Sequence, residues 1–76
     1  MTNSVWEFGV IQHLPDEGRK GIAFIRADAS TSGPDVFMHR SVYASGPWHD
    51  VRVGLRVAFK PATRPKGRYA TEVVKA

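Results

Sequence analysis

Two aromatic rings and an imidazole stand at positions that neighbouring strands would place on one surface. Phe24 lies in the segment GIAFI, and Phe37 and His39 lie in the segment DVFMH. Because strand side chains alternate between two faces, the aliphatic residues of both segments can face a core only if these three side chains face solvent. Exposed rings on adjacent strands present flat apolar faces, and such faces can stack on a planar ligand.

The segment from Lys20 to Ser41, which contains these residues, is expected to form a hairpin of two short strands. Its loop, Asp28 to Asp35, is rich in Ser, Thr, Gly and Pro, which interrupt strand periodicity and turn the chain. The core-facing side chains of the two strands are expected to be the aliphatic ones opposite the rings: Ala23, Ile25, Val36 and Met38.

The chain before this hairpin also has the composition of strands and turns. Residues Ser4 to Leu14 are rich in aromatic and β-branched types and are followed by Pro15, which predicts a long first strand. Gly9 within it indicates a bulge or a sharp bend. A turn is expected over Pro15 to Arg19.

After the hairpin, Ser41 to His49 is expected to form a short helical turn followed by a loop. From Val53 to Pro61, apolar and polar residues alternate as in a half-buried strand. The inward side chains would be Leu55, Val57 and Phe59, and the solvated ones Arg56 and Lys60. A basic turn over Ala62 to Arg68 and a last strand, with Ala70 and Val73 facing the core, complete the expected elements.

The bulk properties indicate one small domain, residues 1–76. A chain of 76 residues buries only about 60% of its unfolded surface, so its core is small. It has no cysteine, which excludes disulfides and thiolate metal sites and is usual in a reducing compartment. The N-terminal residues lack the pattern of a signal peptide or a membrane span, so we expect a cytoplasmic protein with no membrane partner.

Charge is distributed unevenly along the chain. Residues 1–38 carry three basic and five acidic side chains, whereas residues 39–76 carry eight basic and two acidic ones. This concentration of positive charge favours a polyanionic partner, and the alternative is a basic surface that only confers solubility.

Catalytic chemistry is not indicated by any motif. The histidines His13, His39 and His49 lack the spacing of a helical zinc site, and the carboxylates fall mostly in turns. The sequence contains neither a nucleophile elbow nor a phosphate-binding loop. We therefore expect no enzyme activity, no catalytic residue, no metal or other cofactor and no small-molecule substrate.

The segments KGIAFI and DVFMH resemble, in order and spacing, the two signature strands KGFGFI and DVFVH of the cold-shock domain family. The resemblance extends over roughly Gly9 to Val74, with residues 1–8 as an extension of the first strand. It implies an all-β fold, a five-stranded antiparallel Greek-key barrel of the OB type. It also implies binding of single-stranded DNA or RNA without chemistry.

Nine site residues follow from this resemblance. Phe24, Phe37, His39 and Lys20 match the family pattern, and Lys66 takes its basic loop position. His13, Ile22 and Arg40 stand where the family has aromatic residues, and Trp48 stands at a loop aromatic position. Bases are expected to stack on the rings while phosphates run past Lys20, Arg40 and Lys66. Because three stacking residues are replaced, we expect weak binding, with a Kd that is micromolar or higher.

The expected function is that of a monomeric, single-stranded RNA or DNA binder acting as an RNA chaperone or as a regulator of transcription or translation. One alternative is an OB-fold protein-interaction module that has lost most nucleic-acid binding and uses Ile22, Trp6 and Trp48. A third interpretation is an oligosaccharide binder, because OB barrels also hold sugars on aromatic rings. The choice between RNA and DNA stays open, as do the roles of Trp6 and Phe8.

Overall fold

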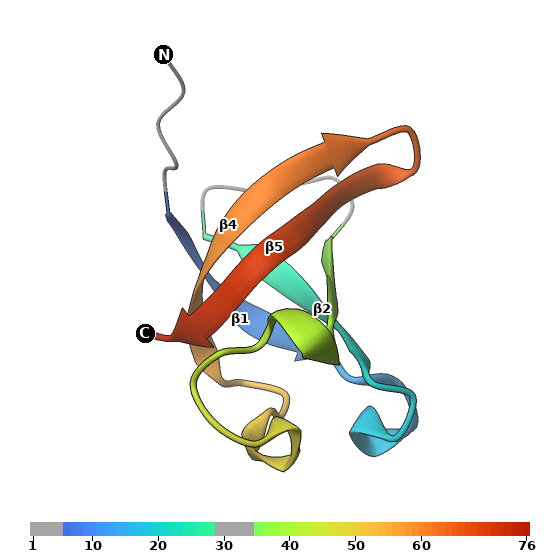
Figure 1. Ribbon diagram of the computed structural model, residues 1–76, viewed down its shortest axis with the longest axis vertical. Coiled ribbons are helices and arrows are strands. Elements are labelled where there is room, and N and C mark those ends of the chain that lie inside the picture. Colours follow the sequence, from blue (N-terminus) through green and yellow to red (C-terminus); the bar gives the residue numbers. More distant parts are fainter. Residues whose placement is uncertain (1–5, 29–34) are drawn as a thin grey trace.

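The computed structural model describes residues 6–28 and 35–76, and in this part of the chain the secondary structure consists of strands and short 3₁₀ segments, without an α-helix (Figure 1). The strands are β1 (Glu7–His13), β2 (Ile22–Ala27), β3 (Val36–His39), β4 (Arg56–Arg64) and β5 (Gly67–Lys75). The 3₁₀ segments are η1 (Pro15–Gly18), η2 (Arg40–Val42) and η3 (Trp48–Asp50). No helix in the described ranges has the length and hydropathy of a membrane-spanning segment.

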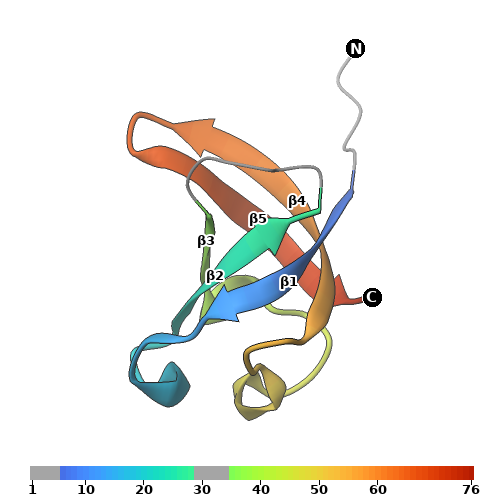
Figure 2. The ribbon, with the colours of Figure 1, turned by 180° about the vertical axis from the view of Figure 1, so that it is seen from behind.

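The strands of the described chain form a closed barrel in the order β1-β2-β3-β5-β4, and β4 pairs with β1 to complete the ring (Figures 1 and 2). The expected five-stranded, OB-like barrel is confirmed. Its pairings are antiparallel except that of β3 with β5, which is parallel. A closed ring with an odd number of strands cannot alternate direction all the way round, so one parallel pair is unavoidable.

The barrel interior contains the aliphatic residues expected from the hairpin. Ala23, Ile25 and Met38 are 0% exposed and Val36 is 1% exposed. The other fully buried large side chains include Ile11, Val57, Phe59 and Val73. Leu55 precedes β4, packs against this core and is half-buried. The alternation of strand side chains therefore predicted the inner faces of β2, β3 and β4 correctly, except at Leu55.

The β4–β5 hairpin is longer than expected. Pro61 does not end the strand, because the register shifts between Lys60 and Pro61 and this irregularity accommodates a residue without an N–H donor. The strand continues to Arg64, which pairs with Gly67, so the expected basic turn over Ala62 to Arg68 is reduced to two residues, Pro65 and Lys66. In Figure 1 this hairpin crosses the front of the barrel and its tip projects beyond the other strands.

The bulge or bend expected at Gly9 is not there, because the register of β1 shifts between Ile11 and His13. A Cβ atom at Gly9 would lie 2.5 Å from the carbonyl oxygen of Arg26 and 2.8 Å from Cγ2 of Ile25. Glycine is thus required there because β2 approaches closely. The first strand begins at Glu7 in the described chain, and the expected strand residues Ser4 and Val5 lie outside the described residues.

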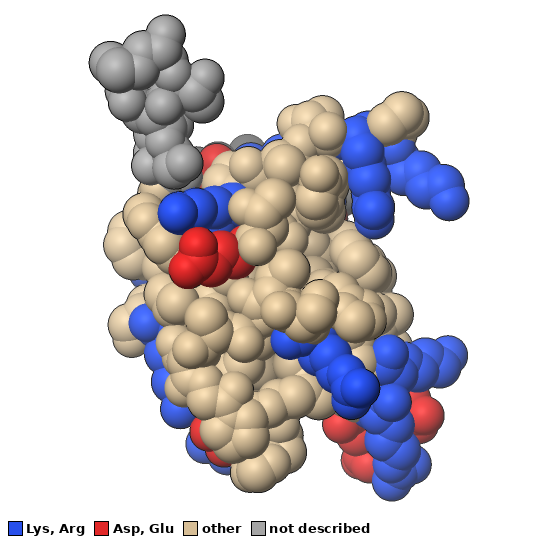
Figure 3. Space-filling model, in the orientation of Figure 1, with Lys and Arg blue, Asp and Glu red and all other residues tan. Residues whose placement is uncertain are grey.

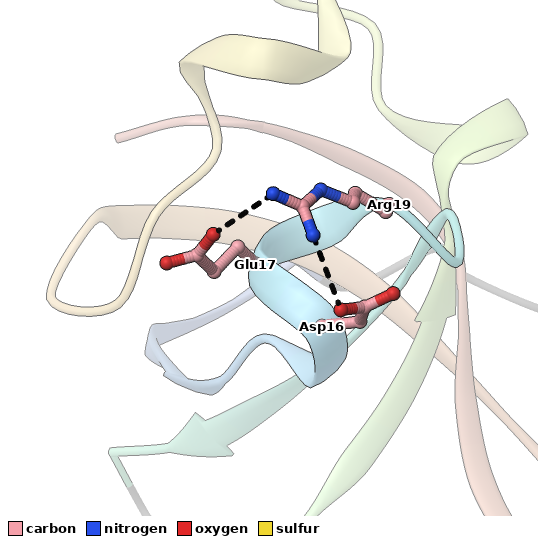
Figure 4. A network of polar contacts seen from close by, with 3 residues as sticks. All are labelled: Asp16, Glu17 and Arg19. Atoms are coloured by element: carbon pink, nitrogen blue, oxygen red, sulfur yellow. Dashed lines mark hydrogen bonds and ion pairs between the residues drawn. The ribbon is translucent and has the colours of Figure 1, made fainter.

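The expected turn over Pro15 to Arg19 is a tight one that contains η1. Asp16 and Glu17 adopt left-handed conformations, with φ of 53° and 55°. Their carboxylates both face the guanidinium of Arg19, at 3.6 Å and 3.4 Å (Figure 4). The short helical turn expected after β3 is present as η2, and η3 adds a second one from Trp48, where a loop was expected. Most of the expected loop Asp28 to Asp35 lies outside the described residues.

Candidate binding surface

Four rings on the outside of the barrel are aligned across neighbouring strands. We call these residues, His13, Phe24, Phe37 and Tyr69, the aromatic row. Strand register aligns them, because His13 pairs with Phe24, Phe24 with Phe37, and Phe37 with Tyr69. Each of these pairings joins adjacent strands, so the row crosses β1, β2, β3 and β5 in turn. The residues next to Phe24 and Phe37 in the chain point into the core, so both rings point out of the barrel.

Within the row, ring contacts join His13 to Phe24 and Phe24 to Phe37. His13 stacks on Phe24 with a centroid distance of 6.0 Å and an interplanar angle of 25°. Phe24 meets Phe37 edge to face at 5.8 Å and 67°. His13 is exposed, whereas Phe24 and Phe37 are half-buried. The row thus presents a partly solvated apolar surface.

Arg64, at the end of β4, lies against the row. Its guanidinium carbon is 5.2 Å from the ring centroid of Phe37 and 4.9 Å from that of Tyr69. Both distances are in the range of cation–π attraction. Arg64 and Tyr69 were not among the residues predicted from the sequence. The expectation that Ala70 faces the core, which is confirmed by its 3% exposure, already implied that Tyr69 points outward.

A groove of about 500 Å³ opens between the row and the tip of the β4–β5 hairpin. Its lining residues are His13, Phe24, Asp35, Phe37, Arg64, Lys66, Gly67 and Arg68. Asp35 is held 3.4 Å from Arg26, and Arg68 donates a hydrogen bond of 3.0 Å to Glu7. The predicted phosphate contact Lys66 is exposed at the rim of this groove, one residue before β5.

Ion pairing leaves positive charge near the row. All seven side-chain carboxylates fall within residues 6–28 and 35–76, and each lies 2.7–3.6 Å from a Lys or Arg nitrogen. In the same ranges, the basic residues without a carboxylate partner are Lys20, Arg40, Arg52, Arg64 and Lys66. Arg64 and Lys66 line the groove, and Lys and Arg atoms project from the hairpin tip at the upper right of Figure 3.

The predicted residues at the other end of the β2–β3 hairpin form a second group. Ile22 pairs with His39 next to the Phe24–Phe37 pair, and the backbone N–H of Arg40 donates to the carbonyl of Gly21 at 2.8 Å. The ring of His39 is exposed, and its Nδ1 accepts from the Ser41 N–H at 3.2 Å. Lys20 is exposed two residues before Ile22. The predicted cations Lys20 and Arg40 therefore lie at the open end of the β2–β3 hairpin, which we call its foot. Lys66 lies near the Phe24–Phe37 pair in the middle of this hairpin.

Trp48 is not part of the aromatic row. Its Nε1 donates a 2.7 Å hydrogen bond to the carbonyl of Gly18, and its ring meets Tyr43 edge to face at 6.4 Å. This half-buried indole packs on the core and joins η3 to η1. The structure therefore gives Trp48 a structural role and does not bring it to the groove.

Trp6 and Phe8 also lie apart from the row, at the opposite end of β1 from His13. Their side chains are 37% and 49% exposed, and the ammonium of Lys60 lies 4.9 Å from a ring centroid of Trp6. Phe8 pairs with Ala58 of β4.

Within the described ranges, no three His, Asp or Glu side chains are grouped as metal ligands. The sequence matches no protein-family model, and a search of curated proteins finds no match.

Proposed function

We propose that this barrel is of the cold-shock type and binds single-stranded RNA or DNA on the aromatic row. The observation that carries the proposal is that rings from adjacent strands share one outer surface, while Arg64 and Lys66 beside them lack carboxylate partners in the described chain. Unpaired nucleobases have flat faces that stack on such rings, and the backbone phosphates require nearby cations.

In this mechanism bases stack on His13, Phe24 and Phe37, with His39 as a further contact at the foot of the hairpin. Each stacked base contributes about 1–3 kcal/mol to binding. His13, Ile22 and Arg40 provide less stacking surface than aromatic carbocycles would, so the Kd is expected to be micromolar or higher. With three or four phosphates paired, log K should fall with log salt at a slope of about −2 to −3.

The proposed biological role follows from selectivity for the unpaired form. A protein that binds single strands and not duplexes shifts the equilibrium toward unpaired nucleic acid by mass action. The barrel would therefore act without ATP, as a monomeric RNA chaperone in the cytoplasm or as a regulator of transcription or translation.

A second candidate function is a protein-interaction module, and the exposure of Trp6 and Phe8 favours it. These two side chains and Val53 are the exposed large hydrophobic residues of the described chain. The residues first considered for this role have different neighbours in the described chain. Trp6 contacts Lys60, Ile22 pairs with His39, and Trp48 donates a hydrogen bond to Gly18. An interaction surface would instead centre on Trp6, which directly precedes β1, and on Phe8 of β1.

The two candidates are separated by fluorescence anisotropy of labelled oligothymidylate and oligouridylate, measured at low and high salt. The label is placed on the oligonucleotide because the row contains no tryptophan. Phe37→Ala should weaken binding by about 1–3 kcal/mol, and Phe8→Ala, which removes an outer ring away from the row, should not. Circular dichroism confirms that each variant is folded. Absence of binding at low salt, or equal losses in both variants, contradicts the proposal.

A further inference from the structure

We propose that Tyr69 and Arg64 form an additional base-binding position, which extends the site from the β1–β2–β3 surface onto the β4–β5 hairpin. This inference rests on the proposed function and specifies how far its site reaches. Neither residue lies in the KGIAFI or DVFMH segment, so the position depends on the pairing of β5 with β3 and of β4 with β5.

Strand pairing places Tyr69 in line with the other rings. Phe37 is the register partner of Tyr69 in the parallel β3–β5 pair, just as Phe24 is the partner of Phe37 in the antiparallel pair. Tyr69 is half-buried, so part of the residue remains open to solvent. A base bound beyond Phe37 along the row would therefore meet an aromatic surface.

Arg64 supplies the polar part of this position. It lies on β4 diagonally from Tyr69, because Ala62 pairs with Tyr69 and Arg64 pairs with Gly67. Its guanidinium lies over both the Phe37 and Tyr69 rings, which reduces the conformational freedom that would be lost when a ligand binds. The nearby carboxylate Asp35 lies 3.4 Å from Arg26, so the donors of Arg64 stay available for a phosphate or a base carbonyl.

The position of Arg64 also couples two binding positions. Since the same guanidinium lies over the Phe37 and Tyr69 rings, a base bound at either ring contacts it. Removal of the Tyr69 ring and removal of the Arg64 charge should therefore not act independently. Strands long enough to reach Tyr69 gain this position, and shorter strands that occupy only His13, Phe24 and Phe37 do not.

The test measures the affinity of labelled oligothymidylates of two to eight nucleotides for four proteins: the parent, Tyr69→Leu, Tyr69→Phe and Arg64→Gln. For the longer strands, Tyr69→Leu should lose about 5- to 30-fold in affinity, part of a full stacking contribution, and Tyr69→Phe should stay within about twofold. In the parent, affinity should rise with oligothymidylate length up to a limit. In Tyr69→Leu this limit should be reached at a strand about one nucleotide shorter. The double variant Tyr69→Leu/Arg64→Gln should lose less than the product of the two single losses.

Different results overturn the two proposals. If Phe37→Ala weakens binding while Tyr69→Leu matches the parent at every length, the additional position is wrong and the proposed function stands. If Tyr69→Leu weakens the shortest and longest strands equally, Tyr69 acts on the whole site and not as an added position. If the parent binds no strand at low salt, both proposals fall. Thermal unfolding checks each variant, and Arg64→Gln supplies the length test should Tyr69→Leu not fold.

Discussion

At the level of single residues, the predicted phenylalanines and the predicted tryptophan behave differently, because only the indole carries an N–H group that needs a hydrogen-bond acceptor. Phe24 and Phe37 have no donor and remain at the surface beside other rings. Trp48 instead turns its N–H toward the carbonyl of Gly18 at 2.7 Å and packs against the core. This hydrogen bond holds the indole between η3 and η1.

Trp48→Phe should therefore destabilise the fold and leave ligand binding unchanged. The substitution removes the N–H donor and leaves the Gly18 carbonyl without it, which costs about 1–2 kcal/mol of unfolding free energy. Denaturant unfolding measures this loss, and oligonucleotide anisotropy is expected to change less than twofold. A strong loss of affinity with unchanged stability would show that Trp48 contacts the ligand after all.

The unpaired cations allow a matched test of electrostatic contacts. Lys66 lines the groove beside the row, whereas Arg52 lines a different groove with His49, Asp50 and Lys75. Lys66→Ala should reduce the magnitude of the salt slope by about 0.7, the contribution of one phosphate. Arg52→Ala removes the same charge and should leave the slope unchanged. Equal effects of the two variants would mean that net charge, and not a local contact, drives binding.

At the level of elements, the site depends on how closely β1 packs against β2, because His13 and Phe24 stack across this pair. Gly9 permits the close approach, with its missing Cβ only 2.5 Å from where the Arg26 carbonyl oxygen lies. A larger residue must push the strands apart.

Gly9→Ala should accordingly lower the unfolding free energy by about 1–3 kcal/mol, the usual range for overpacking. Thermal and denaturant unfolding measure the change. Gln12→Ala, at an exposed position on the same strand, serves as the control and should change stability by less than about 0.5 kcal/mol. A Gly9→Ala variant as stable as the parent would show that β1 and β2 can separate without cost.

At the level of the whole molecule, salt bridges join distant parts of the barrel. Arg56, at the start of β4, donates a 2.7 Å hydrogen bond to Asp28, which directly follows β2. This hydrogen bond lowers the pKa of Asp28 below its ordinary value of 3.8 and raises the pKa of Arg56. Both groups are exposed at the surface, so salt should weaken the pair.

The lowered pKa of Asp28 predicts how stability depends on pH. Since the folded state favours the carboxylate, its contribution is fully present above the unfolded pKa and is lost as pH falls through the folded pKa. The melting temperature of the parent should exceed that of Asp28→Asn near pH 6, and the difference should shrink below about pH 4. A constant difference across this range would contradict the assigned ion pair.

Local alternation of side chains was enough to determine much of this molecule. It predicted the inner face of the β2–β3 hairpin, with Ala23, Ile25, Val36 and Met38 in the core, and the outward positions of Phe24, Phe37 and His39. The five-stranded barrel was expected from the resemblance and is confirmed. The function of the outward residues stays a prediction.

Only the tertiary structure decided the features that depend on pairing between distant segments. The parallel β3–β5 pair places Tyr69 beside Phe37, and the β4–β5 register places Arg64 over both rings. The hydrogen bond that holds Trp48 against η1 joins residues thirty positions apart. Side-chain direction along a strand is a local property of the chain, whereas the neighbours of a side chain across strands follow from barrel closure and from the bulges that set register.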